Sequence, residues 1–242
     1  MKVRVSIDAD RAGLTLNERK AILILSGAVK RVNSVYQKQK QGGFYPRGFS
    51  FHEMDRYCEA HPRERESLLS PVTVVRRQKN KLIAIPYAVF HRRELFEIAR
   101  ELRRASQYIA HKKFKKFLVE RARALLSNKY ESSDRFWVSI DDAPIELVLG
   151  PFEEYDDVIA GVKRSFEGVL GVVRKKETAY VRRYRKHALA FDQALAKKLG
   201  YQRSGRTLSP LVIDEVIASG YSLHEFVPMA SNLPNDVNIH RE

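Results

Sequence analysis

The residues best suited to chemistry lie in the stretch Gly150–Asp157, where four carboxylates fall within five positions. The apolar run Ile145–Gly150 predicts a strand before them, and the glycine and proline at its end predict a sharp exit. In extended backbone Glu153 and Tyr155 share a face because they are two residues apart. A carboxylate and a phenol together can bind an ammonium group. A solvated acidic turn is the plainer interpretation of the same residues.

A second polar stretch, Ser231–Asp236, lies near the end of the sequence. Its Asn-x-Pro-Asn pattern is typical of a turn, which is again the plainer interpretation. The side-chain amides of Asn232 and Asn235 can also donate to and accept from a peptide backbone. Both residues are therefore candidates for binding an extended peptide.

Other kinds of site leave no trace in the sequence. It contains neither a phosphate-binding glycine loop nor a dinucleotide fingerprint, and no Gly-x-Ser-x-Gly nucleophile motif. None of the seven histidines forms a His-Glu-x-x-His pair, so we expect no metal site and no catalytic residue in this chain. The lone Cys58 cannot form an internal disulfide, which suits a reducing compartment.

Charge is distributed unevenly along the sequence, whose formal net charge is +15. His91–Leu125 holds 11 basic residues against 4 acidic ones, and Arg174–Arg206 holds 11 against 2. Lys129–Leu170, between them, holds 4 basic residues against 10 acidic ones. The basic segments favour a polyanion such as nucleic acid, but the acidic middle argues against nucleic-acid binding as the main role. No run reaches the roughly 18 apolar residues of a membrane span. With no signal peptide either, we expect a cytoplasmic protein without a membrane partner.

Periodicity and capping residues predict a mixed α+β fold. A capping box at Thr15 and Glu18 starts the first helix, and a second at Ser50 and Glu53 starts a short one. We expect helices over about 15–40, 50–61, 92–127 (one helix or a pair), 178–199 and 209–220, a hairpin over 72–85, and strands over 145–150 and 169–173. Trp137–Ile140 is apolar with alternation. We expect a helical N-terminal region, 1–70, and a mixed α/β substrate-binding lobe, 71–242, packed as one unit.

Taken together, several motifs resemble the dipeptidyl-peptidase III family of zinc peptidases. No single motif is decisive, but their order and spacing are specific over about Gly43 to Asn235. The matching segments are Gly43–Pro46, Glu59–Glu64, Leu69–Arg77, Ser133-Asp134 with Trp137, Pro144–Glu146, Gly150–Asp157, Lys163, Phe166–Gly168 and Asn232–Asp236.

The resemblance implies a two-lobed fold around a wide cleft, with a β-barrel in one lobe and zinc in the other, mostly helical, lobe. It also implies an enzyme that removes dipeptides from the N-terminus of short peptides. Glu153 and Tyr155 would bind the free α-ammonium group and adjacent backbone, while Asn232 and Asn235 would hydrogen-bond the peptide backbone. The family motif varies at the position of Glu154.

This chain departs from the family in one large respect. The family's zinc sequence, His-Glu-x-x-Gly-His or a one-residue variant, lies downstream of the Asn-Leu-Pro-Asn stretch, and this sequence stops before it. We therefore expect the N-terminal, substrate-binding part of a dipeptidyl-peptidase III-like enzyme, inactive by itself, with short peptides and a zinc-bearing C-terminal part or chain as partners. The resemblance implies zinc in the complete enzyme, and we expect none for this chain alone. The alternatives are a non-catalytic peptide-binding protein and a basic nucleic-acid-binding protein.

Overall fold

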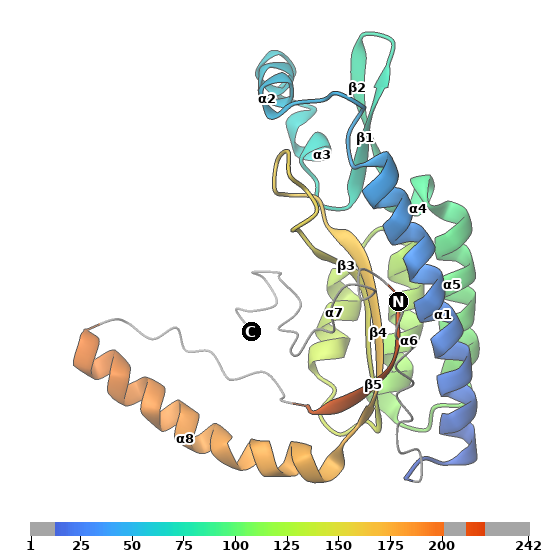
Figure 1. Ribbon diagram of the computed structural model, residues 1–242, viewed down its shortest axis with the longest axis vertical. Coiled ribbons are helices and arrows are strands. Elements are labelled where there is room, and N and C mark those ends of the chain that lie inside the picture. The colour runs from blue at the N-terminus through green and yellow to red at the C-terminus, as the bar shows by residue number, and fades with distance from the viewer. Residues whose placement is uncertain (1–12, 201–211, 221–242) are drawn as a thin grey trace, which may run out of the picture.

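A computed structural model describes residues 13–200 and 212–220 (Figure 1). Its helices are α1 (Leu16–Gly42), α2 (Phe51–Ala60), α3 (Arg65–Leu68), α4 (Tyr87–Phe90), α5 (Arg92–Ser106), α6 (Lys112–Ser127), α7 (Glu131–Val138) and α8 (Lys175–Leu199). Its strands are β1 (Thr73–Gln78), β2 (Lys81–Pro86), β3 (Ile145–Glu153), β4 (Ser165–Val173) and β5 (Asp214–Ser219).

The long helix α1 begins at the predicted capping box. The Thr15 hydroxyl accepts a hydrogen bond from the backbone N–H of Glu18 at 3.2 Å, and the Glu18 carboxylate accepts one from the Thr15 N–H at 2.7 Å. These bonds satisfy N–H groups that a helix start leaves without intrahelical partners. One stripe of α1 is fully buried, and its members are Ala21, Leu25, Ala28, Val29, Val32 and Val35.

Two antiparallel sheets form beside this helix. β1 and β2 make the predicted hairpin, in which Val75 pairs with Ala84. The other sheet has the strand order β3-β4-β5. One of its faces packs on α1: a Cβ at Gly168 would lie 3.2 Å from the Val32 side chain, so glycine permits the close approach of strand and helix. The hydrophobic core lies between this face and the helices.

A buried arginine supports the end of β3. Arg121 of α6 is fully buried, forms an ion pair with Asp134, and lies 5.3 Å from the centre of the Phe152 ring. A Cβ at Gly150 would lie 2.8 Å from its Nη1 atom. The missing side chain at Gly150 therefore makes room for the guanidinium beneath the strand.

Trp137, where an apolar segment with alternation begins in the sequence, belongs to helix α7. Two details of the sequence prediction are wrong. The helix expected over 209–220 is instead the strand β5 from Asp214, where Val216 pairs with Gly171 of β4. Pairing to the free edge of β4 decides the structure of this segment, because strand formation depends on neighbours far away in sequence. The strands also form no closed barrel within 13–200 and 212–220.

The α+β fold class is confirmed, as two small antiparallel sheets with mostly helical surroundings. The boundary expected near residue 70 stays a prediction. Among the described helices, none combines the length and apolar character that crossing a bilayer requires. The last helix, α8, follows β4 and extends away from the body of the molecule (Figure 1).

Candidate functional site

Asp157 anchors the acidic loop that follows β3. Its carboxylate accepts hydrogen bonds of 2.8–3.1 Å from four backbone N–H groups between residues 159 and 163. The Tyr45 hydroxyl donates a fifth at 2.8 Å. Burial alone would raise the pKa of Asp157, but these hydrogen bonds outweigh burial and lower it. Asp157 is therefore a structural carboxylate whose donors stabilise its charge.

Lys163, at the end of the same loop, connects it by hydrogen bonds to the segment 68–73. Its buried Nζ donates to the carbonyls of Leu68 and Ser70 at 2.6 and 2.7 Å, and to the Thr73 hydroxyl at 2.8 Å. Burial lowers the pKa of Lys163 to about 8, although the charge of Asp157 opposes that shift. Three acceptors match the three N–H bonds of an ammonium group. Lys163 thus fixes the loop to the segment before β1.

Two further carboxylates of the loop have partners. Glu154 forms an ion pair with the Arg164 Nε at 2.8 Å, and Asp156 accepts a hydrogen bond of 2.8 Å from the Ser165 hydroxyl. Three of the four carboxylates that follow Phe152 therefore hold the loop in place. Only Glu153 differs.

Glu153, the last residue of β3, has a buried oxygen without a donor. Its side chain is partly buried, and Oε2 finds no hydrogen-bond partner in the described part of the chain. Burial raises the pKa of Glu153, and the negative charges of Asp156 and Glu154 raise it further. Leaving a buried acceptor unpaired costs about 1–3 kcal/mol. A ligand that donates a hydrogen bond here would recover that cost.

A second carboxylate, Glu167 of β4, lies on the same face of the sheet. Gly150 pairs with Glu167 and, across a β-bulge, Glu153 pairs with Ser165; residues directly opposite in an antiparallel pair share a face. Glu167 is 2% exposed, and its Oε1 also lacks a partner among the described residues. Burial, and then the charge of Glu153, raises the pKa of Glu167 to about 8. We call Glu153 and Glu167 the carboxylate pair.

The rest of this sheet face carries apolar side chains, the carboxyl group of Glu146 and, beside Gly150 and Phe152, the guanidinium of Arg121. Val148 and Val169 pack there with Phe152 and with Trp137 of α7. The Trp137 indole donates to Glu146 at 2.7 Å, and burial raises the pKa of that carboxyl to about 7. Glu146 therefore accepts a hydrogen bond from a side-chain N–H, whereas Glu153 Oε2 and Glu167 Oε1 have no donor among the described residues.

Tyr155 does not continue the strand. β3 ends at Glu153, and Tyr155 lies in the following turn, where the residue is 86% exposed. The expectation that extended backbone places both side chains on one face is therefore wrong, because the bonds to Asp157 fold the loop. The phenol points into solvent. Asn232 and Asn235, the other predicted contacts, lie outside the described residues.

Metal-ligating side chains are scattered over the molecule. Within 13–200 and 212–220, no three His, Cys, Asp or Glu side chains gather in a way that could hold a metal ion. His91 is buried, His111 accepts from the Phe114 N–H at the start of α6, and His61 stacks on Tyr57. Burial raises the pKa of the Cys58 thiol, which disfavours the thiolate. The described residues therefore do not fit a zinc site.

Glu167 is the site residue that sequence reasoning did not single out. The signal available was a lone carboxylate inside the apolar run Phe166–Val173. Such a residue needs a partner or a function, since ionisable side chains are rarely fully buried alone. Its closeness to Glu153 depends on the register of β3 with β4, which the sequence does not state.

Two solved structures match the fold of this chain over about half of their own length. The structure of dipeptidyl-peptidase III from Caldithrix abyssi matches with a TM-score of 0.89 and 24% identity, covering 98% of this chain and 55% of that one. Dipeptidyl-peptidase III from Corallococcus sp. strain EGB matches with a TM-score of 0.88 and 22% identity, covering 99% and 55%. This chain thus spans about half the length of either structure.

Sequence comparison gives the family. Nudix hydrolase 3 of Arabidopsis thaliana is 27% identical over 208 residues, which are 86% of this chain and 26% of that protein. Residues 29–239 match the family described as peptidase family M49. That match covers most of the chain and confirms the resemblance to dipeptidyl-peptidase III. The chain belongs to peptidase family M49.

Proposed function

We propose that this chain is the substrate-binding part of a dipeptidyl-peptidase III-like metallopeptidase, and that the carboxylate pair binds the free N-terminus of a short peptide. The observation that carries the proposal is the presence of two buried carboxylate oxygens, on Glu153 and Glu167, without donors. Membership of a peptidase family supports a peptide as the ligand.

A peptide's α-ammonium group has the chemistry that the pair lacks. It supplies one positive charge and three N–H donors, and its pKa of roughly 7.7–8.0 keeps it charged near neutral pH. Burial, and then the charge of Glu153, raise the pKa of Glu167, and a cation between the two carboxylates would oppose both effects. Binding should therefore be accompanied by ionisation of Glu167 and release of its proton.

The remaining substrate contacts rest on the family resemblance. In this proposal Tyr155 binds the backbone next to the ammonium group, and its exposed phenol leaves it free to do so. Asn232 and Asn235 hydrogen-bond the peptide backbone further along. In the complete enzyme, residues outside this chain would hold zinc, which would supply the Lewis acid that activates water. The chain alone should therefore not hydrolyse peptides.

The helix α8 supports a role within a larger assembly. One stripe of it is apolar at helical spacing, formed by Tyr180, Tyr184, Ala188, Phe191, Leu195 and Leu199. Tyr184 is 53% exposed and Phe191 is 70% exposed. The matches to the solved structures cover 98–99% of this chain, so they include most of α8, and about 45% of each solved chain lies outside the match. We propose that this remaining part of the family fold covers the α8 stripe.

Calorimetry with tetra-alanine and N-acetyl-tetra-alanine tests the ammonium site. The free peptide should bind and the acetylated one should not. Glu153→Gln should weaken binding about 10- to 100-fold, because a hydrogen bond to a charged group contributes about 1.5–3 kcal/mol. Glu154→Gln, one residue away and paired with Arg164, should change affinity less than about three-fold. Equal losses in the two variants would refute the assignment.

Photo-crosslinking tests the assembly and separates it from the alternative of a peptide-binding protein that never cleaves. A photoreactive phenylalanine at position 191, introduced in the source cells, should capture a polypeptide with the family's zinc sequence. The same group at Gln193, on the opposite side of α8, should not. Capture of a second copy of this chain, of an unrelated protein, or of nothing contradicts the proposed assembly and leaves the calorimetry unaffected.

A further inference from the structure

The outer side of α5 forms a stripe of arginines around an exposed phenylalanine. Successive residues of an α-helix are rotated by about 100° around its axis, and the five arginines and the phenylalanine of this stripe fall within an arc of about 120° around the axis of α5. All are exposed, and Phe96 near the middle is 53% exposed. We call the set the α5 arginine stripe: Arg92, Arg93, Arg100, Arg103 and Arg104, with Phe96.

The carboxylates of α5 leave most of this stripe without ion pairs. Glu94 pairs with Lys38 of α1 at 2.5 Å, and Glu101 pairs with Arg31 of α1 at 3.0 Å. Glu97 pairs with Arg100 of the stripe at 2.5 Å. In the part of the chain that the structure describes, the other four arginines of the stripe form no ion pair. Within the 120° arc every charged residue is an arginine, whereas a solvated charged face usually mixes both signs.

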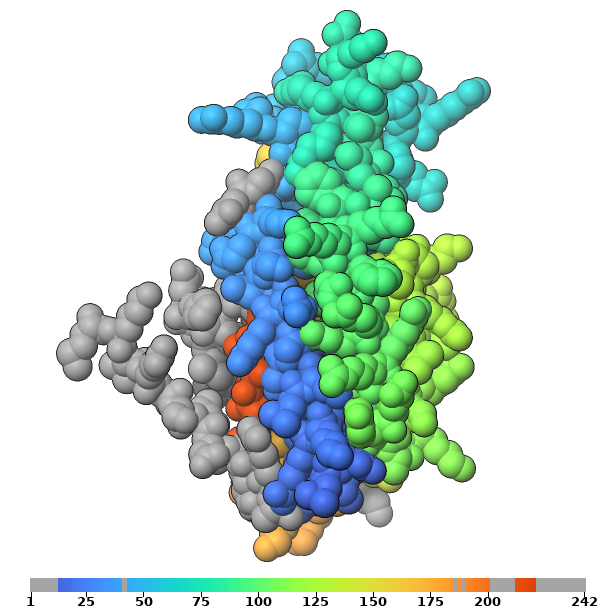
Figure 2. Space-filling view, turned by 90° about the vertical axis from the view of Figure 1, so that its right-hand side faces the viewer, coloured from blue at the N-terminus to red at the C-terminus, as the bar shows by residue number. Residues whose placement is uncertain are grey.

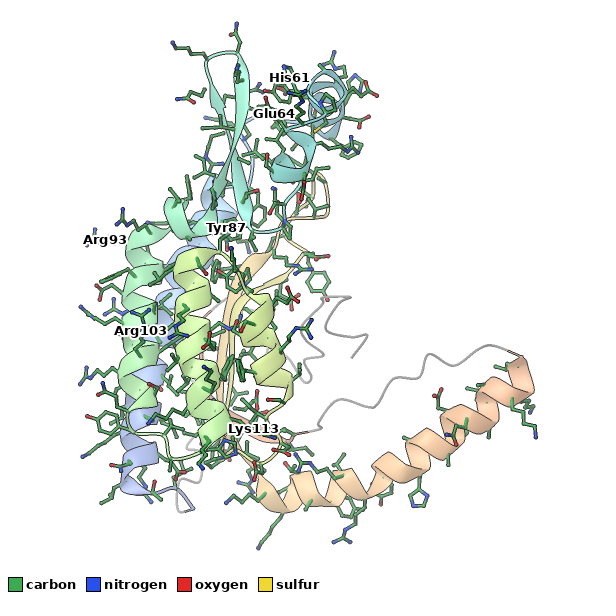
Figure 3. The ribbon with its side chains drawn as sticks, turned by 180° about the vertical axis from the view of Figure 1, so that it is seen from behind. His61, Glu64, Tyr87, Arg93, Arg103 and Lys113 are labelled. Atoms are coloured by element: carbon green, nitrogen blue, oxygen red, sulfur yellow. The ribbon has the colours of Figure 1, made fainter. Side chains whose placement is uncertain are left out.

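The stripe is long and lies on a broad face. Its ends, Arg92 and Arg104, are separated by about 18 Å along the helix axis. Figure 3 places Arg93 and Arg103 along the same helix, and Figure 2 shows α5 between α1 and α6 on one side of the molecule. The exposed Lys112 and Lys115 of the neighbouring helix α6 have no ion pair among the described residues either.

The residue types indicate a particular polyanion. Arginine binds phosphate through two parallel hydrogen bonds and also stacks on bases, which lysine does not do. An exposed aromatic among arginines can stack on an unpaired base. A layer of three helices is too wide for the roughly 12 Å major groove of a duplex. With one apolar side chain, the stripe also lacks the apolar face that inserts into a bilayer.

We propose that the α5 arginine stripe binds single-stranded nucleic acid, with phosphates on the arginines and a base on Phe96. No residue of the stripe belongs to β3, β4 or the loop between them, so this function goes beyond peptide binding. The charge balance supports the same partner, because the chain carries a formal net charge of +15.

Fluorescence anisotropy with a labelled uridine oligomer of about 20 nucleotides tests the proposal. The double variant Arg93→Glu/Arg103→Glu should weaken binding at least ten-fold. It should also flatten the slope of log K against log salt by about 1.4, since each lost phosphate contact on a single strand contributes about 0.7. Phe96→Ala should weaken binding about ten-fold with the slope unchanged, and Phe96→Trp should restore it.

The control is a double variant with the same charge change elsewhere. Arg47 and Arg63 are exposed and have no ion pair among the described residues, so Arg47→Glu/Arg63→Glu should cost less than three-fold. An equal loss in the control would mean that net charge alone drives binding and would overturn the proposal. Tighter binding to a matching duplex or to phosphatidylserine vesicles would overturn it too, as would no binding of the oligomer at about 0.05 M salt.

Discussion

Asp157 and Glu167 are both buried carboxylates, ten residues apart, but they differ in their hydrogen-bond donors and in the direction of their pKa shifts. Asp157 receives five hydrogen bonds, and its pKa is lowered. Glu167 has an oxygen without a donor, and its pKa is raised to about 8. The difference separates a carboxylate that holds the fold together from one that we propose to bind a ligand.

The largest effect on stability should come from removing Asp157. Asp157→Ala leaves five donors without their acceptor and removes the negative charge nearest to Lys163. We expect a loss of about 3–5 kcal/mol in the free energy of unfolding, measured with urea at pH 7. A loss below 1 kcal/mol would mean that the loop is held by other contacts.

Removing the charge at Glu167 should act in the opposite direction. A carboxyl whose folded pKa is raised to about 8 destabilises the fold increasingly as pH rises from about 4.5 to 8. We expect Glu167→Gln to stabilise the protein by about 2–4 kcal/mol at pH 9 and to leave stability nearly unchanged at pH 4. Urea unfolding at both pH values checks this, and destabilisation at pH 9 would contradict an unpartnered Glu167.

A smaller effect should distinguish the two neighbours at the strand end. Glu153→Gln should raise stability at pH 7, because burial and two nearby negative charges disfavour its ionised form. Glu154→Gln should lower stability by less than about 1 kcal/mol, since its ion pair with Arg164 is partly exposed. Thermal unfolding of the two variants should show Tm shifts of opposite sign. Tm shifts of the same sign would contradict the difference in environment between Glu153 and Glu154.

The smallest effect should be seen at Tyr155. The residue is 86% exposed, so Tyr155→Ala should change the free energy of unfolding by less than about 0.5 kcal/mol. The affinity for tetra-alanine should nevertheless fall if the phenol contacts peptide. Unchanged affinity together with unchanged stability would restrict the site to the carboxylate pair.

Local signals in the sequence predict the fold well, and long-range signals do not. The capping residues Thr15 and Ser50 predict where α1 and α2 begin, because an N-cap acts within one turn. The strand β5 escapes prediction, since its structure depends on the edge of β4. The same limit applies to the site: Glu153 is visible as part of an acidic stretch, whereas its pairing with Glu167 requires a strand register and a β-bulge.

The central claim is that the carboxylate pair is an ammonium site, and carbon NMR of the glutamate carboxyls tests it most directly. Without peptide, Glu167 should titrate near pH 8. With saturating tetra-alanine its midpoint should move well below 7, because a bound ammonium group stabilises the ionised form. N-acetyl-tetra-alanine should leave it in place. A Glu167 midpoint that stays near 8 with saturating tetra-alanine would contradict the account.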